Sequence, residues 1–184
     1  PYLVMEYLEG EDLRASITNG RVCTLQQKLD IALQIAKALA HIHSLNIIHR
    51  DVKPENVHVS PRGQIKVMDF GIAKMQGFDR TRTGFSIGSP FYMAPEQVQG
   101  TVITPVVDVY AFGMVLYELV AGVRACKGDT IEQIFYTILH EPINLEPLRG
   151  AGLPSSLIDL IEACTSKQPS SRPQTFSDVI ARLE

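Results

Sequence analysis

The chain has 184 residues, a formal net charge of −3, 45% hydrophobic residues and 20% charged residues. This composition predicts one soluble globular domain with a sizeable core and argues against a disordered chain. The slightly acidic balance offers no basic surface for nucleic acid and no polybasic segment for a membrane. Three cysteines without a C-x-x-C pair predict reduced, mostly buried thiols in a cytoplasmic protein: Cys23, Cys126 and Cys164.

Hydrophobic periodicity predicts a mainly helical chain with a few short strands. The expected elements are a strand at 1–7, helices at 12–18 and 25–43, and a hairpin of strands at 57–59 and 65–67. Four more helices are expected after the hairpin. One spans 106–123, a second ends at 139, a third starts at 154 and a fourth ends near 183. Capping-box patterns mark three helix starts: Thr24 with Gln27, Asp129 with Glu132, and Thr175 with Asp178. His41 and His43, near the end of the long helix, are expected to face solvent or the helix dipole.

The apolar stretch from 106 to 123 is long enough to be mistaken for a membrane span. Asp108 and Glu118 lie within it, and charged side chains are costly in lipid. We therefore expect a helix buried in the protein core, and no membrane segment in this chain. A polar loop from 69 to 96 is expected to be functional, because loops of this length are uncommon in compact domains.

A cluster of polar residues from His49 to Asn56 lies between the long helix and the hairpin. Phosphoryl transfer needs a positioned nucleophile, metal ions on the phosphates and positive charge where negative charge develops. Asp51 can orient a substrate hydroxyl and accept its proton, and Lys53 can reach the transferred phosphate. Asn56 supplies a hard oxygen ligand that suits Mg²⁺.

A second motif, Met68–Gly71, follows the second strand of the hairpin. Asp69 can bind Mg²⁺, Phe70 can anchor the segment in the core, and Gly71 permits a backbone turn that other residues do not adopt. The hairpin between the two motifs is expected to bring Asn56 and Asp69 close together.

These motifs, in this order and spacing, resemble the eukaryotic-type protein kinase family over nearly the whole chain. Three further segments match: residues 88–96 with Ser89 and Glu96, residues 108–113 beginning at Asp108, and Arg172 with Pro173. The resemblance implies a mainly α fold, the kinase C-terminal lobe, in which a helical bundle carries a short β-hairpin with the catalytic loops. It implies that residues 1–9 form the hinge and the end of the small lobe and residues 10–184 form the large lobe. The small lobe itself is expected to be absent from this chain.

The same resemblance is to serine/threonine kinases, most of all the bacterial ones. It implies transfer of the γ-phosphate of ATP, with Mg²⁺, to Ser or Thr hydroxyls of protein substrates. Asp51 and Lys53 are the implied catalytic residues, and Asn56 and Asp69 the implied metal ligands. No nucleic acid partner is expected, and a homodimer for autophosphorylation is left open, as is a membrane anchor elsewhere in the longer protein.

The first residues are similar to an adenine-binding hinge. Glu6 and Leu8 stand where backbone groups meet adenine, and Asp12 stands near the ribose, although Asp12 is equally plausible as a helix N-cap. His58 occupies a position where the family usually has an aliphatic residue under adenine. This substitution predicts a neutral imidazole that stacks on the base or, as the alternative, weakened nucleotide binding.

The resemblance also implies structural and regulatory residues. His49 is expected to pack in the core with Phe70 rather than act as a general base, and Glu96 is expected to pair with Arg172. Thr81 and Thr83 are expected phosphorylation sites in the long loop. Arg50 is the implied partner of their phosphate, and that contact would fix Ser89 near Asp51.

Two other functions remain as alternatives, a pseudokinase that binds partners and a hydrolase that uses His49 and Asp51. The hydrolase lacks a G-x-S-x-G nucleophile elbow. The chain also lacks a glycine-rich phosphate loop and a strand lysine, so we expect it to fold but to be inactive alone and to bind ATP poorly. An apolar surface around Val4, Leu13 and Val57 is expected to be exposed where the small lobe would sit.

Overall fold

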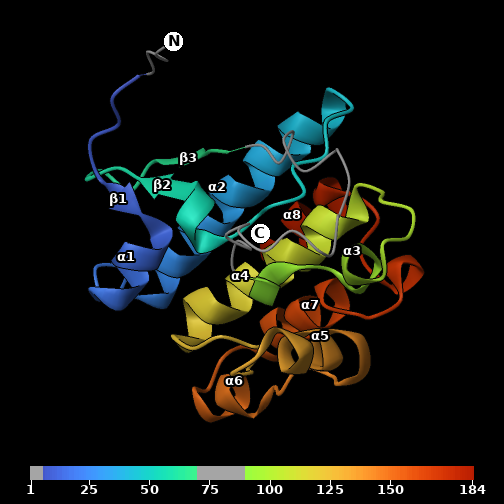
Figure 1. Cartoon of the computed structure of the whole chain (residues 1–184). Coiled ribbons are helices and arrows are strands. Elements are labelled where there is room, and N and C mark those ends of the chain that lie inside the picture. Colours follow the sequence, from blue (N-terminus) through green and yellow to red (C-terminus); the bar gives the residue numbers. More distant parts are fainter. Residues whose placement is uncertain (1–5, 70–89) are drawn as a thin grey trace.

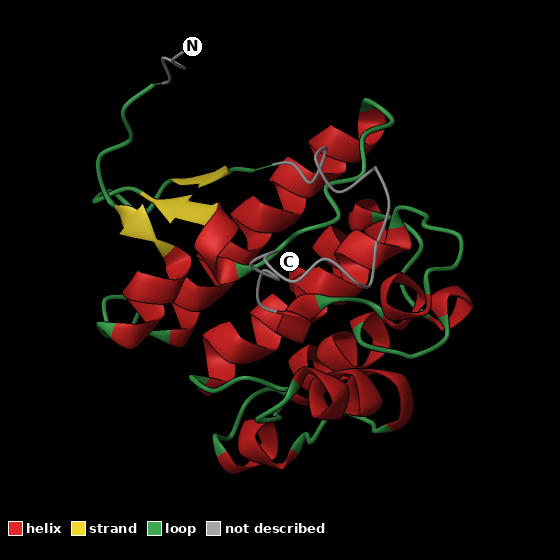
Figure 2. Ribbon diagram, viewed as in Figure 1, coloured by secondary structure: helices red, strands yellow, loops and turns green. Residues whose placement is uncertain are grey.

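The computed structural model of the protein describes residues 6–69 and 90–184. Helices form most of it, and a small sheet lies at one edge of the helices (Figures 1 and 2). The helices are α1 Leu13–Thr18, α2 Leu25–Ser44, α3 Pro95–Gln99, α4 Val106–Ala121, α5 Ile131–His140, α6 Glu146–Gly150, α7 Ser155–Cys164 and α8 Phe176–Leu183. The strands are β1 Glu11–Asp12, β2 Val57–Val59 and β3 Ile65–Val67, and the 3₁₀ turns are η1 Pro54–Asn56, η3 Pro90–Tyr92 and η4 Pro169–Ser171. The expected mainly α fold with a short hairpin is confirmed.

The sheet is antiparallel, in the order β1–β2–β3. The strand predicted at 1–7 is wrong where the structure describes it, because Glu6 and Tyr7 lie in a loop and Tyr7 is 89% exposed. The strand occurs later, where Glu11 lies opposite Val59. A β-prone run forms a strand only where it finds a partner for its backbone groups, and β2 offers that partner to Glu11 and its neighbour.

Side-chain caps set the starts of the helices. Two predicted capping boxes are confirmed: Thr24 with Gln27 on α2, and Thr175 with Asp178 on α8. The cap predicted for α5 is wrong by one residue. The hydroxyl of Thr130 accepts the backbone N–H of Gln133 at 3.3 Å, whereas the backbone N–H of Asp129 donates to the Gln133 side chain at 2.9 Å. Both residue types are good caps, and the extended backbone at Thr130 decides between them.

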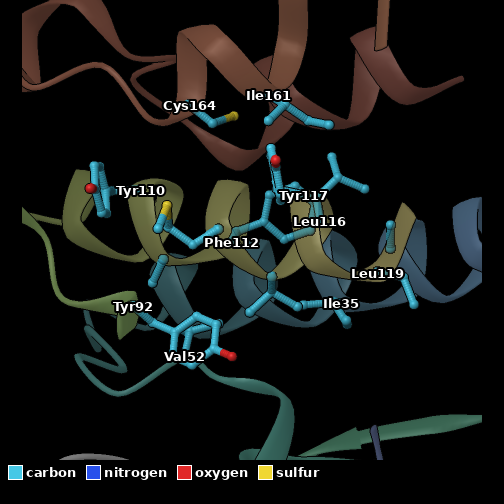
Figure 3. Packing of buried hydrophobic residues seen from close by; sticks show 14 of the residues in the cluster. Ile35, Val52, Tyr92, Tyr110, Phe112, Leu116, Tyr117, Leu119, Ile161 and Cys164 are labelled. Carbon is cyan, nitrogen blue, oxygen red and sulfur yellow. The ribbon is translucent and has the colours of Figure 1, made fainter. Parts of the chain in front are cut away.

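Helix α4 is the centre of the core. Every residue from Val106 to Val120 is buried, which confirms the predicted core helix, and α2, α6 and α7 pack against it (Figure 3). At Gly113 a Cβ atom would lie 2.7 Å from the Cβ of Cys164, so the missing side chain allows α4 and α7 to approach closely. Within the described ranges, no helix has both the length and the apolar character that crossing a membrane requires.

The apolar surface expected around Leu13 and Val57 is not found, because both side chains are 0% exposed. Leu13 begins α1 and Val57 begins β2, and both belong to the same core cluster as the central helix. The described part of the chain therefore buries these residues by itself. Val4 lies outside the described residues.

The three cysteines are free, as expected for reduced thiols. Cys126 and Cys164 are buried, and burial raises the pKa of the Cys126 thiol to about 11 and that of Cys164 to about 12. Cys23 differs from the prediction only in that it is exposed. The two buried thiols therefore behave as small apolar core residues.

A buried ion pair joins α3 to the segment between η4 and α8. Arg172 donates to both carboxylate oxygens of Glu96, at 2.6 and 2.9 Å, and also to the backbone oxygens of Val106, Ser166 and Lys167. The predicted pairing of Glu96 with Arg172 is therefore confirmed. A buried ion pair contributes to stability only when further hydrogen bonds satisfy the guanidinium, and the three carbonyl groups supply them.

Replacing Arg172 with methionine should destabilise the protein by about 3–5 kcal/mol, because Glu96 would remain buried without its partner. Urea unfolding measures this loss. The matched control is Lys37→Met, since Lys37 pairs with Glu184 while both side chains are 55% exposed. That change should cost less than about 1 kcal/mol. Similar losses in the two variants would contradict the role given to the buried pair.

Candidate active site

Asp51, Lys53 and Asn56 form one cluster after the end of α2. The ammonium group of Lys53 lies 2.8 Å from Oδ2 of Asp51. The side-chain nitrogen of Asn56 donates to the backbone oxygen of Asp51 at 2.8 Å and to its Oδ2 at 3.2 Å. A 3₁₀ turn at Pro54–Asn56 brings the asparagine back toward the aspartate. The carboxylate of Asp51, the ammonium group of Lys53 and the amide of Asn56 are thus held together by hydrogen bonds.

The first residue of this loop, His49, is fully buried and bonded through both ring nitrogens. Its Nε2 lies 2.9 Å from the carbonyl oxygen of Met68, and its Nδ1 lies 3.3 Å from the backbone nitrogen of Asp51. A carbonyl only accepts and a backbone N–H only donates, so Nε2 carries the proton and Nδ1 accepts. This tautomer supports a structural role for His49 and disfavours a hydrolytic base.

Asp108, in the first turn of α4, binds the backbone of the loop that carries Asp51. Its Oδ2 accepts the backbone N–H of His49 at 2.8 Å, and its Oδ1 accepts that of Arg50 at 2.8 Å. Oδ2 also lies 2.8 Å from Nε2 of His43, whose ring packs edge-on against Phe176. The expectation that His43 faces solvent or the helix dipole is therefore wrong, because a buried carboxylate captures its ring. His41 is exposed, as expected.

Asp69 lies two residues after the end of β3, in a left-handed backbone conformation with φ of 54°. The backbone N–H of Met68 donates to the carbonyl oxygen of Asn56 at 2.8 Å, so the hairpin brings the two expected metal ligands to the same end of the sheet. The amide nitrogen of Asn56 donates to Asp51, so the metal-binding role expected for Asn56 rests on its amide oxygen. An amide oxygen and an exposed carboxylate fit the oxygen donors that Mg²⁺ prefers.

The expected hinge residues lie beside the sheet. The carboxylate of Glu6 bonds Nζ of Lys66 at 2.7 Å, and Leu8 is partly buried. Asp12 is an N-cap, since its Oδ1 accepts the backbone N–H of Ala15 at 2.7 Å. His58 is nearly buried, and its Nε2 lies 3.0 Å from the carbonyl oxygen of Glu9, so the imidazole anchors the expected hinge segment to β2.

A network that the sequence analysis missed lies beneath the site. The guanidinium of Arg14 on α1 bonds Glu55 at 3.1 Å and also contacts both Tyr92 and Glu118. Burial and the Glu118 carboxylate raise the pKa of Tyr92, whose hydroxyl donates to that carboxylate. Oε2 of Glu55 is buried without a hydrogen-bond partner in the part of the chain that the structure describes. The signal in the sequence was Glu118, one of two acidic residues in the apolar stretch that forms α4.

Several expected site residues fall outside the described residues: Phe70, Gly71, Thr81, Thr83 and Ser89. Of the three residues expected to act in regulation, the structure describes Arg50 but not the two threonines. The backbone of Arg50 has φ of 67°, a left-handed conformation that is costly for a residue with a side chain.

Comparison with known proteins gives the family of the chain. A family model described as protein kinase domain matches residues 1–182. A probable serine/threonine-protein kinase of Clostridium perfringens is 39% identical over 184 residues, which is 100% of this chain and 27% of the relative. Serine/threonine-protein kinase PknA of Mycobacterium tuberculosis is 38% identical over 186 residues, covering 99% of this chain and 42% of that protein. PrkC of Bacillus subtilis is 36% identical over 184 residues, covering 100% of this chain and 28% of that protein.

The fold agrees with this assignment. The crystal structure of Rad53 1-466 in complex with AMP-PNP matches with a TM-score of 0.79 at 24% identity, over 96% of this chain and 44% of that chain. This likeness confirms the expected kinase-like architecture. The chain spans less than half the length of the relatives described above. Its family model, its relatives and its fold agree, and the chain belongs to the protein kinase family, with relatives among the bacterial serine/threonine kinases.

Proposed function

We propose that this chain is the large lobe of a serine/threonine kinase that transfers the γ-phosphate of ATP to protein hydroxyls. The observation that carries the proposal is the cluster of Asp51, Lys53 and Asn56, with Lys53 and Asp51 2.8 Å apart. In-line phosphoryl transfer depends on positioning and electrostatics, and this cluster offers a proton acceptor beside a cation.

Each member of the cluster has a distinct proposed role. Asp51 orients the substrate hydroxyl and accepts its proton, while Lys53 stabilises the negative charge on the transferred phosphate. Asn56 and Asp69 hold Mg²⁺, which neutralises charge on the phosphates when it is bound. Lys53 also holds the Asp51 carboxylate in place, since a charge-assisted hydrogen bond fixes its orientation.

The nucleotide is proposed to bind between this lobe and a small lobe supplied by the longer protein. Glu6 and Leu8 belong to the hinge at residues 1–9, and residues 10–184 form the large lobe. The bond from His58 to the Glu9 carbonyl supports a role in fixing the hinge, in addition to the proposed place under adenine. Half of the site then lies in the other lobe, and the 184-residue chain alone is proposed to be inactive.

Replacing Asp51 with asparagine in the full-length protein should lower kcat by several orders of magnitude, because the proton acceptor is lost while both metal ligands stay. The affinity for Mg·ATP should change less than about twofold, because Asp51 makes no contact with the metal in this proposal. Radiolabelled phosphate transfer and calorimetric titration with Mg·ATP measure the two quantities.

Asp69→Asn is the contrasting variant and should weaken binding of Mg·ATP, while Asp159→Asn, on the exposed face of α7, is the control and should change neither quantity. Near-normal turnover in Asp51→Asn would overturn the assignment. Binding of ATP without any transfer by the unmodified protein would instead favour a pseudokinase.

Regulation is proposed to act through the loop before Pro90. Thr81 lies between Arg80 and Arg82 in the sequence, and Thr83 follows Arg82. A phosphate on either threonine would add about −1.5 to −2 charge for Arg50 to bind. Ordering the loop would place Ser89 beside Asp51.

The full-length protein incubated with Mg²⁺ and ATP should gain phosphate on Thr81 or Thr83, as mass spectrometry of its peptides would show. The double change Thr81→Ala and Thr83→Ala should lower activity severalfold, because the loop loses the charge that binds Arg50. The matched control changes Ser155 and Ser156, exposed on α7, to alanine and should leave activity unchanged. Phosphate found only outside residues 75–90, with full activity in the double threonine variant, would exclude this regulation.

A further inference from the structure

Gln97 connects two parts of the site that are far apart in the sequence. It is the third residue of α3, and its Oε1 accepts the backbone N–H of Ala94 at 2.9 Å. Its Nε2 donates to the backbone oxygen of Arg50 at 3.0 Å. One side-chain amide therefore caps the start of α3 and reaches a carbonyl 47 residues away.

The carbonyl that Gln97 holds belongs to the most constrained residue of the catalytic loop. Arg50 has φ of 67°, and its N–H is fixed by Asp108 at 2.8 Å. Its carbonyl shares a peptide plane with the N–H of Asp51, which lies 3.3 Å from Nδ1 of His49. A conformation of this kind persists only where surrounding contacts determine it, and Gln97 supplies the contact on the carbonyl side.

We propose that Gln97 is a positioning residue that acts through the Arg50 carbonyl on the orientation of Asp51. It links the segment after Pro90 to the backbone of the residue that precedes Asp51, and the inference about turnover rests on the proposed function. The chemistry of the site selects glutamine, because the side chain must accept from one backbone group and donate to another. An ionised glutamate can only accept.

The decisive variant in the full-length protein is Gln97→Glu, which keeps the acceptor for Ala94 and places an oxygen against the Arg50 carbonyl. Gln99→Glu is the matched control, because it makes the same charge change on the exposed side of the same helix. Gln97→Met removes both hydrogen bonds at similar length without adding charge. If the glutamate variant does not fold, Gln97→Met carries the comparisons of amide exchange and of kcat with KM at neutral pH.

Two measurements are needed, hydrogen exchange of the amides of Arg50 and Asp51, and kcat with the KM for ATP. In Gln97→Glu at neutral pH both amides should exchange about tenfold faster, and kcat should fall about tenfold while KM changes less than about twofold. A glutamate carboxyl ordinarily has a pKa of about 4.3, but the position against the Arg50 carbonyl raises the pKa, because only the protonated form can donate there. Lowering the pH therefore restores the hydrogen bond to Arg50. The kcat of Gln97→Glu divided by the wild-type kcat should therefore rise as the pH is lowered from 8 to 5.5. Taking this ratio removes the effect of titrating Asp51, which both proteins share.

Unchanged exchange and kcat in Gln97→Glu would overturn the proposal, as would a lowered kcat whose ratio stays flat with pH. A loss confined to Gln97→Met would also overturn it, because Gln97 would then be only a cap for α3. If the unmodified protein transfers no phosphate, the proposed function fails, while the exchange of the two amides still decides whether Gln97 holds the loop.

Discussion

The carboxylate of Asp108 is the interaction on which the geometry of the site depends. It is completely buried at the start of α4, and it accepts the backbone N–H groups of both His49 and Arg50. Two features make this buried charge tolerable. The positive end of the α4 dipole favours an anion in the first turn, and the ring of His43 lies 2.8 Å from the same carboxylate. The loop that carries Asp51 is thus attached to the most deeply buried helix in the described part of the protein, so the left-handed backbone of Arg50 is held against the core.

The residues that form and orient the site come from short, medium and long distances along the sequence. Asp51, Lys53 and Asn56 lie within six residues and are brought together by a single 3₁₀ turn. The antiparallel pairing of β2 with β3 brings Asp69 toward the same place, because the backbone N–H of Met68 donates to the carbonyl oxygen of Asn56. The contacts that orient the loop come from much farther along the chain, from α3 and α4, so this local cluster depends on the folding of the helices around it.

Elements set by neighbouring residues could be predicted from the sequence, whereas most contacts between residues far apart in the sequence could not. Periodicity and capping patterns identified α2, α4 and α8, because each depends on residues a few positions apart. β1 was placed wrongly because its partner lies 48 residues later, opposite Glu11. The contact between Arg14 and Glu118 spans 104 residues, and the pairing of Gln97 with Arg50 spans 47, so spacing alone gave no sign of either. The ion pair of Glu96 with Arg172 is a long-range contact between described residues that was expected, and that expectation came from the family resemblance.

Hydrogen exchange of the His49 and Arg50 amides in an Asp108→Asn variant tests the central claim most directly. Asparagine keeps one acceptor oxygen and turns an NH₂ group toward a backbone donor, so the two amides cannot both remain bonded. The account predicts that at least one of them exchanges about tenfold faster or more, while amides in the middle of α4 keep their protection. An Asp30→Asn variant, changed on the surface of α2, should show the unmodified pattern. Full protection of both amides in Asp108→Asn would contradict the account.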